Sequence, residues 1–185
     1  MLECCRSINK KCAIVCITTD KVYENDEFGI PFKENDKLGG YDPYSASKAM
    51  AEIAVQSYRR SFFFSNDCDI RAASARAGNV IGGGDFAQDR IIPDIVDAIY
   101  HGKAVEIRNP NAIRPWQHVL EPLDGYVKLA EKLYSSDDKS WQEAWNFGPN
   151  ESSFKEVRYI VEKSIAIFKH GAWKDLSMAS NLHEA

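Results

Sequence analysis

The sequence has 185 residues, of which 44% are hydrophobic and 27% charged, with a formal net charge of −4 at pH 7. This composition predicts a soluble globular protein, and the overall charge excludes a strongly basic nucleic-acid binder. No stretch of about eighteen apolar residues predicts a membrane-spanning helix, and residues 1–15 lack the order of a signal peptide. We therefore expect a cytoplasmic protein that binds neither nucleic acid nor a membrane.

The five cysteines are odd in number and crowd toward the N-terminus, and no second metal-spaced pair accompanies them. We expect reduced thiols and no metal site. The cysteines are Cys4, Cys5, Cys12, Cys16 and Cys68.

The first half of the chain predicts strand, loop, helix and strand. Residues 12–18 are continuously apolar and rich in branched side chains, as in a parallel strand that is covered on both faces. Asp42 and Pro43 form an N-cap and first-turn pair, which predicts a helix running toward Arg60. A second strand is expected from residue 69, leading into a glycine-rich loop.

The second half continues the alternation. We expect a helix over residues 91–102 closed by Gly102, a hairpin over 104–119 that turns at 109–111, and a short strand near 144–148. Pro122 opens a predicted helix, and Ser153 with Glu156 forms a predicted capping box for the last one. The apolar positions assigned to these two helices are Leu123, Val127, Ala130 and Leu133, and then Val157, Ile160, Val161 and Ile165. This order of elements is typical of an α/β sheet.

Polar side chains follow the first strand and recur on the helix after it. Thr18 to Lys21 fall at the carboxyl end of the strand, where open parallel sheets bind ligands, although a solvated turn would read the same in isolation. Tyr44 and Lys48 are four residues apart and share one helix face. An ammonium beside a phenol favours the phenolate, so such a pair can act as a base near neutral pH.

Four segments together resemble the extended short-chain dehydrogenase/reductase superfamily, most closely its CDP-glucose 4,6-dehydratases. They read TTDKVY from residue 18, YSASKAMAE from 44, RAGNVIGGGDFAQDRIIPD from 76 and IRPWQHV from 113. The similarity extends from about residue 12 to the C-terminus. It implies NAD as cofactor, a nucleotide sugar as substrate, and a place in deoxysugar biosynthesis such as that of lipopolysaccharide O-antigen.

The resemblance implies a role for each residue around the strand end. Tyr44, assisted by Lys48 and Thr19, would take the proton of the sugar 4-hydroxyl, and Thr18, Tyr44 and Lys48 would contact the cofactor. Asp20 matches the acid that protonates the departing 6-hydroxyl. Lys21 matches the C5 base, a position that holds glutamate in related dTDP-glucose dehydratases; stabilising the C5 enolate is the alternative role for a lysine.

The resemblance also implies how the substrate is held. Asn79 matches the family asparagine near the sugar and diphosphate, and Arg90 and Arg114 match residues that hold the diphosphate and nucleotide, a task that suits a permanently charged guanidinium. His118 is read as a structural histidine. Residues 1–80 then form the catalytic half of a Rossmann-like NAD-binding domain, and residues 81–185 mainly a substrate-binding region with interleaved sheet elements.

A glycine-rich stretch, GGGDFA at residues 82–87, satisfies the dinucleotide fingerprint by letter only. No helix start lies within it and no acidic strand end follows, so we expect a substrate loop. The fold class is therefore a partial Rossmann-like doubly wound parallel sheet that lacks the N-terminal fingerprint half. We expect weak NAD binding by the chain alone, and an apolar edge and face at the 12–18 strand that meet water.

Three functions remain open at this point. The first is a CDP-glucose 4,6-dehydratase present as an internal fragment. The second is another nucleotide-sugar dehydratase or an epimerase of the same fold, although an epimerase has no use for Asp20 and Lys21 poised for elimination. The third is a truncated, non-catalytic protein that binds a partner. The helix from Pro43 is apolar on more than one side, which is compatible with a homodimer through it.

Overall fold

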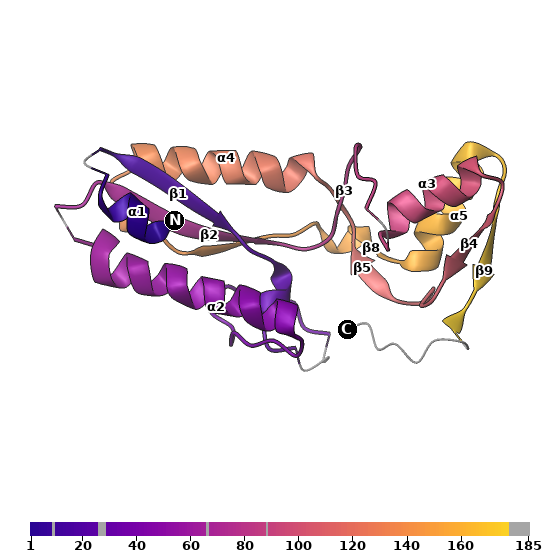
Figure 1. Cartoon of the computed structure of the whole chain (residues 1–185), viewed down its shortest axis with the longest axis horizontal. Helices are drawn as coiled ribbons and strands as arrows, with labels where there is room; N and C mark the ends of the chain where they lie inside the picture. The colour runs from indigo at the N-terminus through magenta and orange to yellow at the C-terminus, as the bar shows by residue number, and fades with distance from the viewer. Residues whose placement is uncertain (9, 26–28, 66, 88, 178–185) are drawn as a thin grey trace. The chain divides into compact units, whose positions relative to one another are not determined.

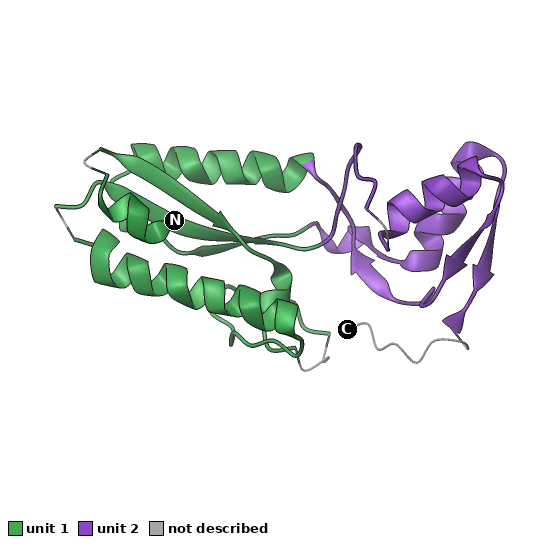
Figure 2. Ribbon diagram, in the orientation of Figure 1, with its two compact units in different colours: residues 1–78, 120–148 green, residues 79–119, 149–185 purple. Residues whose placement is uncertain are grey.

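The computed structural model describes residues 1–8, 10–25, 29–65, 67–87 and 89–177. They form two compact units, each built from two separate segments of chain (Figure 2). Unit 1 comprises residues 1–78 and 120–148, and unit 2 comprises residues 79–119 and 149–185.

Unit 1 is a parallel sheet between helices. Its strands β1 (Cys12–Ile17), β2 (Ile70–Ala77) and β7 (Ala144–Phe147) lie in the order β1-β2-β7, and all pairs are parallel. Helices α2 (Pro43–Tyr58) and α4 (Leu120–Ser135) cover opposite faces of this sheet, and the short α1 (Leu2–Arg6) lies near α2 (Figure 1). The predicted doubly wound parallel α/β architecture is confirmed.

The strand β1 shows why a continuous apolar run was needed. Ile14 packs on one face with Phe63 and Ile70, whereas Ala13 and Val15 pack on the other face with residues of α4. Both faces are therefore covered, as predicted. Among the described residues β1 pairs only with β2, so its other edge is open, and Ile17 is 50% exposed there.

The helix α2 begins where its local sequence predicts. Asp42 is the N-cap, and its carboxylate accepts hydrogen bonds from the backbone nitrogens of Tyr44 at 2.8 Å and Ser45 at 3.1 Å. Pro43 occupies the first turn, where no backbone donor is required. The helix then runs to Tyr58 and continues as a wider turn over Arg59–Phe63.

The helix α4 begins earlier than predicted, and only some of its apolar side chains are buried. It begins at Leu120, two residues before Pro122, and it buries Leu129 and Leu133. Of the apolar positions placed on this helix, Leu133 is buried, whereas Val127 is 59% exposed and Leu123 is 45% exposed. The helix approaches β7 through Gly125, where an added Cβ would lie 2.3 Å from the Phe147 ring, and this close approach turns the 125–129–133 face inward.

The described residues of unit 2 form three two-stranded pairs and two α-helices. The strands β3 (Val80–Ile81) and β6 (Gln117–His118) are parallel, as are β4 (Ala104–Ile107) and β9 (Ala172–Asp175), whereas β5 (Ile113–Pro115) and β8 (Phe154–Glu156) are antiparallel. The helices are α3 (Ile91–Tyr100) and α5 (Val157–Phe168). Their core comprises Ile95, Ile99, Val105, Ile107 and Val161.

Two local predictions in unit 2 are wrong. The predicted hairpin over 104–119 does not form, because β4 pairs with β9 and β5 with β8, both of which come from much later in the chain. The predicted capping box fails because α5 has Glu156 as its N-cap with no side-chain cap bond, while Ser153 ends a short 3-10 turn, η4 (Glu151–Ser153). The loop over 82–87 contains no helix start, and α3 begins only at Ile91.

Three further properties concern the described part of the chain. None of its helices is both long and apolar enough to cross a membrane. Within the same residues, histidine, cysteine and acidic side chains nowhere gather in a group that could hold a metal ion. All five cysteines are free thiols, and burial raises the pKa of Cys16 above its ordinary value.

Candidate active site

The first half of the candidate site is the turn that follows β1. The backbone nitrogen of Thr18 still bonds to the carbonyl of Ala75 at 2.8 Å, which keeps Thr18 in the sheet. Thr19 is the N-cap of a short 3-10 turn, η1 (Asp20–Val22), because its hydroxyl accepts a hydrogen bond from the Lys21 nitrogen at 3.3 Å. The same hydroxyl donates to Asp20 Oδ1 at 3.1 Å. Thr19 is buried, while Asp20 and Lys21 reach solvent.

The pKa of the Asp20 carboxyl group is shifted by its surroundings. Loss of solvation raises the pKa of Asp20 above its ordinary value, against the opposing effects of the Thr19 hydrogen bond and the Lys21 charge. A raised pKa keeps a carboxylic acid able to donate a proton at higher pH than usual. The pKa of Asp20 therefore departs from its ordinary value in the direction that favours proton donation.

The second half of the site lies on the first two turns of α2. Tyr44 is 53% exposed, and the Lys48 ammonium nitrogen lies 5.8 Å from the centre of its ring. Lys48 is partly buried. The pair therefore presents a phenol and an ammonium on one accessible helix face, as the four-residue spacing predicts.

Two observations show that the two halves are neighbours. Val22 of η1 and Ala49 of α2 belong to the same buried cluster, so the turn packs directly against the residue that follows Lys48. The pKa of Asp42 is lowered, mainly by hydrogen bonds from Ser45 and to a smaller extent by the charge of Lys21. The start of α2 and the strand-end turn thus form one polar surface in unit 1.

The residues predicted to hold the substrate belong to unit 2. Asn79 and Arg90 are exposed, and Arg90 is the N-cap position of α3 without a side-chain cap bond. Arg114 on β5 lies opposite Lys155 on β8, and it is partly buried. His118 is exposed on β6, opposite Ile81 on β3. Arg90 and Arg114 add positive charge to unit 2.

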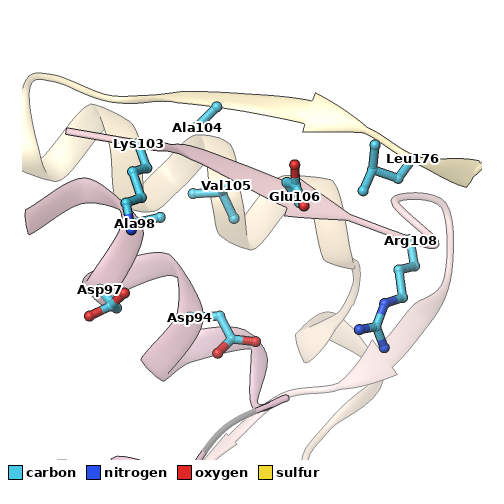
Figure 3. Close-up of a pocket in the computed structure, with 9 residues that line it drawn as sticks. All are labelled: Asp94, Asp97, Ala98, Lys103, Ala104, Val105, Glu106, Arg108 and Leu176. Carbon is cyan, nitrogen blue, oxygen red and sulfur yellow. The ribbon is translucent and has the colours of Figure 1, made fainter. Parts of the chain in front are cut away.

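A pocket of about 640 Å³ in unit 2 contains none of the predicted substrate residues (Figure 3). It is lined by α3 and β4, with the carboxylates of Asp94 and Glu106 and the guanidinium of Arg108. Arg108 is paired with Asp89 at 3.1 Å, and desolvation together with nearby carboxylates raises the pKa of Asp94. Its mixed charges select no ligand class, so it has no part in the candidate site.

A second, mainly apolar groove of about 600 Å³ lies in unit 1, beside the open edge of β1. Val15 and Ile17 of β1 and Ala54 of α2 contribute to its wall, and Thr18 lies at the strand end within it. The predicted apolar edge meets solvent and adjoins the candidate catalytic turn, whereas the predicted exposed face is wrong because both faces of β1 are covered by packed side chains.

The sequence analysis missed a buried ionic network under this surface. Glu52 on α2 is 3% exposed and Arg76 on β2 is 4% exposed, and they are joined by a 2.8 Å ion pair. The spacing of Tyr44, Lys48 and Glu52, each four residues after the last, was the signal that could have identified it, because it puts all three on one helix face.

Comparison with known proteins identifies the class. The chain belongs to the NAD dependent epimerase/dehydratase family, whose sequence model matches residues 1–148. In particular, it is 45% identical over 188 residues to the CDP-glucose 4,6-dehydratase of Salmonella typhimurium, with 100% of this chain and 52% of that protein covered. The resemblance predicted from the four sequence segments is therefore confirmed.

More distant proteins include a curated dehydratase that is similar in sequence and solved structures that share the fold. The dTDP-D-glucose 4,6-dehydratase of Dictyostelium discoideum is 32% identical over 117 residues, covering 58% of this chain and 25% of that protein. The NAD complex of dTDP-glucose 4,6-dehydratase from Bacillus anthracis superposes with a TM-score of 0.68 at 22% identity, covering 87% of this chain and 48% of the other. UDP-glucuronic acid 4-epimerase from Bacillus cereus, with UDP-glucuronic acid and NAD, gives a TM-score of 0.77 at 19% identity, covering 94% and 51%. The chain spans about half the length of the Salmonella relative and less of the other curated relatives.

Proposed function

We propose that the chain carries the catalytic residues of an NAD-dependent CDP-glucose 4,6-dehydratase, which converts CDP-glucose to CDP-4-keto-6-deoxyglucose. The observation that carries the proposal is the packing of the Thr19–Lys21 turn against the helix of Tyr44 and Lys48, since this puts an acid, a basic group and a phenol on one surface. The 45% identity to the Salmonella enzyme supports CDP-glucose as the substrate.

Tyr44 is the base of the first step. Its side chain is 53% exposed, and the Lys48 ammonium nitrogen lies 5.8 Å from its ring centre, so on this proposal Tyr44 takes the proton of the sugar 4-hydroxyl with the Lys48 charge nearby. Thr19 contributes a hydroxyl held in place by the cap of η1, and it can hydrogen-bond to the same sugar oxygen. Removal of this proton prepares C4 for oxidation.

The accessible groups fit the nicotinamide riboside end of NAD. Tyr44 and Lys48 offer a phenol oxygen and ammonium donors that suit ribose hydroxyls, and Thr18 borders an apolar groove. When bound, NAD supplies an acceptor for the C4 hydride and later returns a hydride at C6. Among the described residues no glycine fingerprint joins a strand to a helix, so no group is assigned to the pyrophosphate.

Asp20 and Lys21 serve the elimination of water. The 4-keto group acidifies the C5 proton, and Lys21 either takes this proton or stabilises the enolate by its charge. Asp20, whose pKa is raised by desolvation, protonates the departing 6-hydroxyl. This acid beside the Tyr44 helix favours a dehydratase over an epimerase, which needs no acid at C6.

The substrate nucleotide is assigned to unit 2 residues. Asn79, Arg90 and Arg114 would hold the sugar and diphosphate, and permanently charged guanidinium groups suit phosphate oxygens. On this proposal residues 1–80 are the catalytic half of the NAD-binding domain and residues 81–185 mainly the substrate region, with α4 and β7 returning to the sheet of unit 1.

Incubation of the chain with NAD and CDP-glucose tests the proposal. A product whose mass is lower by one water, and whose C6 carries a methyl group by NMR, would support the proposal directly, although little or no turnover is expected of the chain alone because it is expected to bind NAD weakly. UDP-glucose and dTDP-glucose are the matched substrates, and Tyr44→Phe is the control variant that should abolish turnover. Binding of NAD by titration without turnover would point to an incomplete site, and the absence of both would fit either a fragment of the enzyme or a non-catalytic, partner-binding protein.

The proposal extends to assembly and location. Met50 and Ile53 on the outer side of α2 are 62% and 54% exposed, which supports a homodimer formed through this helix. A cytoplasmic place in deoxysugar biosynthesis, such as that of lipopolysaccharide O-antigen, follows from the nucleotide-sugar substrate.

A further inference from the structure

The carboxylate of Glu52 connects the middle of α2 to the ends of two strands. It accepts hydrogen bonds from the Thr18 hydroxyl at the end of β1 and from Ser74 Oγ of β2 at 2.6 Å. It also accepts from Arg76 Nη2 at 2.8 Å. Three donors from three positions of the sheet therefore converge on one side chain of the helix that carries Tyr44 and Lys48.

The partner of Glu52 is itself fixed from the other side. Arg76 Nη1 donates to the Tyr23 hydroxyl at 2.7 Å and to the carbonyl of Glu34 at 3.0 Å. Tyr23 in turn donates to Asn146 Oδ1 on β7 at 2.7 Å. The network thus joins the segment that follows the catalytic turn to β7, with Arg76 at its centre.

The energetics of this network suggest that it positions α2 and contributes little to the stability of the fold. Burial alone would raise the pKa of Glu52, but hydrogen bonds from Arg76, Ser74 and Thr18 outweigh it and hold the pKa below its ordinary value. A buried ion pair seldom stabilises a fold more than well-packed apolar residues would, because both ions lose their hydration. The Nε of Arg76 moreover is buried and has no hydrogen-bond partner among the described residues.

The network fixes the position of α2 along the sheet. An apolar contact would let α2 slide along the sheet at little cost, whereas a carboxylate with three donors has one favourable position. Glu52 lies one helical turn from Lys48 and two from Tyr44, so its position sets theirs. Its hydrogen bond with Thr18, the residue directly before Thr19, fixes α2 relative to the end of β1.

We propose that Glu52, anchored by Arg76, is a positioning residue that holds Tyr44 and Lys48 in register with the Thr19–Lys21 turn. The catalytic meaning of this register rests on the function proposed above. Glu52 is 3% exposed and so lies out of reach of a substrate on the surface, and its effect passes through α2 and Thr18. The Thr18 hydroxyl is engaged in this network, and any contact of Thr18 with a cofactor is left to its other atoms.

Hydrogen exchange of the intact chain, measured by mass spectrometry, tests the register directly. In Glu52→Gln the amides of residues 17–24 and 43–51 are expected to exchange about tenfold faster, while those of 127–135 in α4 stay within about twofold of the unchanged chain. Thr18→Val removes a single hydroxyl, keeps the shape of the side chain, and should give a smaller change in the same two windows. It also decides the question if Glu52→Gln does not fold.

The matched control is Glu143→Gln. Glu143 pairs with another buried arginine, Arg59, at 2.8 Å in the same unit, but at the far end of α2 from Tyr44. This variant is expected to leave residues 17–24 and 43–51 unchanged. Equal acceleration by Glu143→Gln, acceleration spread evenly over the chain, or none in either Glu52→Gln or Thr18→Val would overturn the proposal.

A kinetic readout separates this inference from the proposed function. If the unchanged chain turns over CDP-glucose, Glu52→Gln is expected to lower kcat by about 10–100-fold with KM within about twofold, because a misplaced base costs rate rather than affinity. A rise in KM with unchanged kcat would contradict a positioning role. If the unchanged chain shows neither NAD binding nor turnover, the proposed function loses its support, while the exchange windows still decide whether Glu52 sets the register of α2.

Discussion

Replacing Gly40 with alanine is expected to disturb the start of α2 and thereby the candidate site. An added Cβ at this position would lie 2.3 Å from the backbone nitrogen of Ala46 and 2.6 Å from the carbonyl carbon of Ser45. Ordinary contact begins at 3.4 Å, so the backbone would have to move by about 1 Å. The obstructing atoms belong to the helix turn that carries Tyr44, and no side-chain rotation can relieve the overlap.

The magnitude follows from two opposing terms. Overpacking of this kind costs about 1–3 kcal/mol. Alanine recovers about 0.4–1 kcal/mol because it restricts the unfolded chain more than glycine does. We therefore expect Gly40→Ala to lower the free energy of unfolding by about 1–2 kcal/mol.

Urea unfolding followed by circular dichroism measures this difference. Gly148→Ala is the matched control, because no atom lies within 4 Å of a Cβ added there and its φ is not in the left-handed region. That variant should be neutral or slightly stabilising. Equal urea midpoints for the two variants would refute the reasoning that the chain at Gly40 is pressed against α2.

Three further predictions concern stability and assembly. Because the pKa of Glu52 is lowered in the folded chain, the contribution of its carboxylate to stability is complete above about pH 4.3 and is lost as the pH falls through the folded pKa. The urea midpoint of the unchanged chain should therefore fall at acidic pH, and this fall should be smaller in Glu52→Gln. Gly125→Ala should gain about 1 kcal/mol of helix propensity yet destabilise α4, since the new Cβ would lie 2.3 Å from the Phe147 ring. Adding Phe147→Leu should restore the thermal midpoint, and an unrestored midpoint would show that the overlap with Phe147 is not the cause. Ile53→Lys should convert a dimer to a monomer in light scattering while changing the unfolding free energy by no more than about 0.5 kcal/mol, because Ile53 is 54% exposed; an unchanged molar mass above that of a monomer would exclude α2 as the interface.

Elements with strong local signals were predictable from the sequence. The Asp42 cap and Pro43 define the start of α2 through bonds that span only three residues, and the alternating contacts of Ile14 and Val15 need only an apolar run. The Tyr44 and Lys48 face follows from helical geometry alone. These features depend on neighbours in the chain, which a sequence displays directly.

Features that depend on distant partners were not predictable. The segment over 104–119 carries a good turn signal, but β4 pairs with residues 172–175 and β5 with residues 154–156, and nothing local announces either partner. The apolar positions of α4 did not show which of them are buried, because Gly125, and not the apolar side chains, decides how the helix docks. The Glu52 and Arg76 pair joins residues 24 positions apart, so its burial is visible only in the fold.

The interleaving of the two units has a consequence for the way the chain matures on the ribosome. The sheet of unit 1 gains β7 only after residue 147 has been made, and unit 2 gains β8, α5 and β9 later still. Neither unit can reach its final form as a continuous nascent segment, because each waits for residues that follow part of the other. A ribosome that stalls within residues 79–119 would therefore release a β1-β2 pair that lacks both β7 and α4, and such a product is a natural substrate for chaperones and proteases.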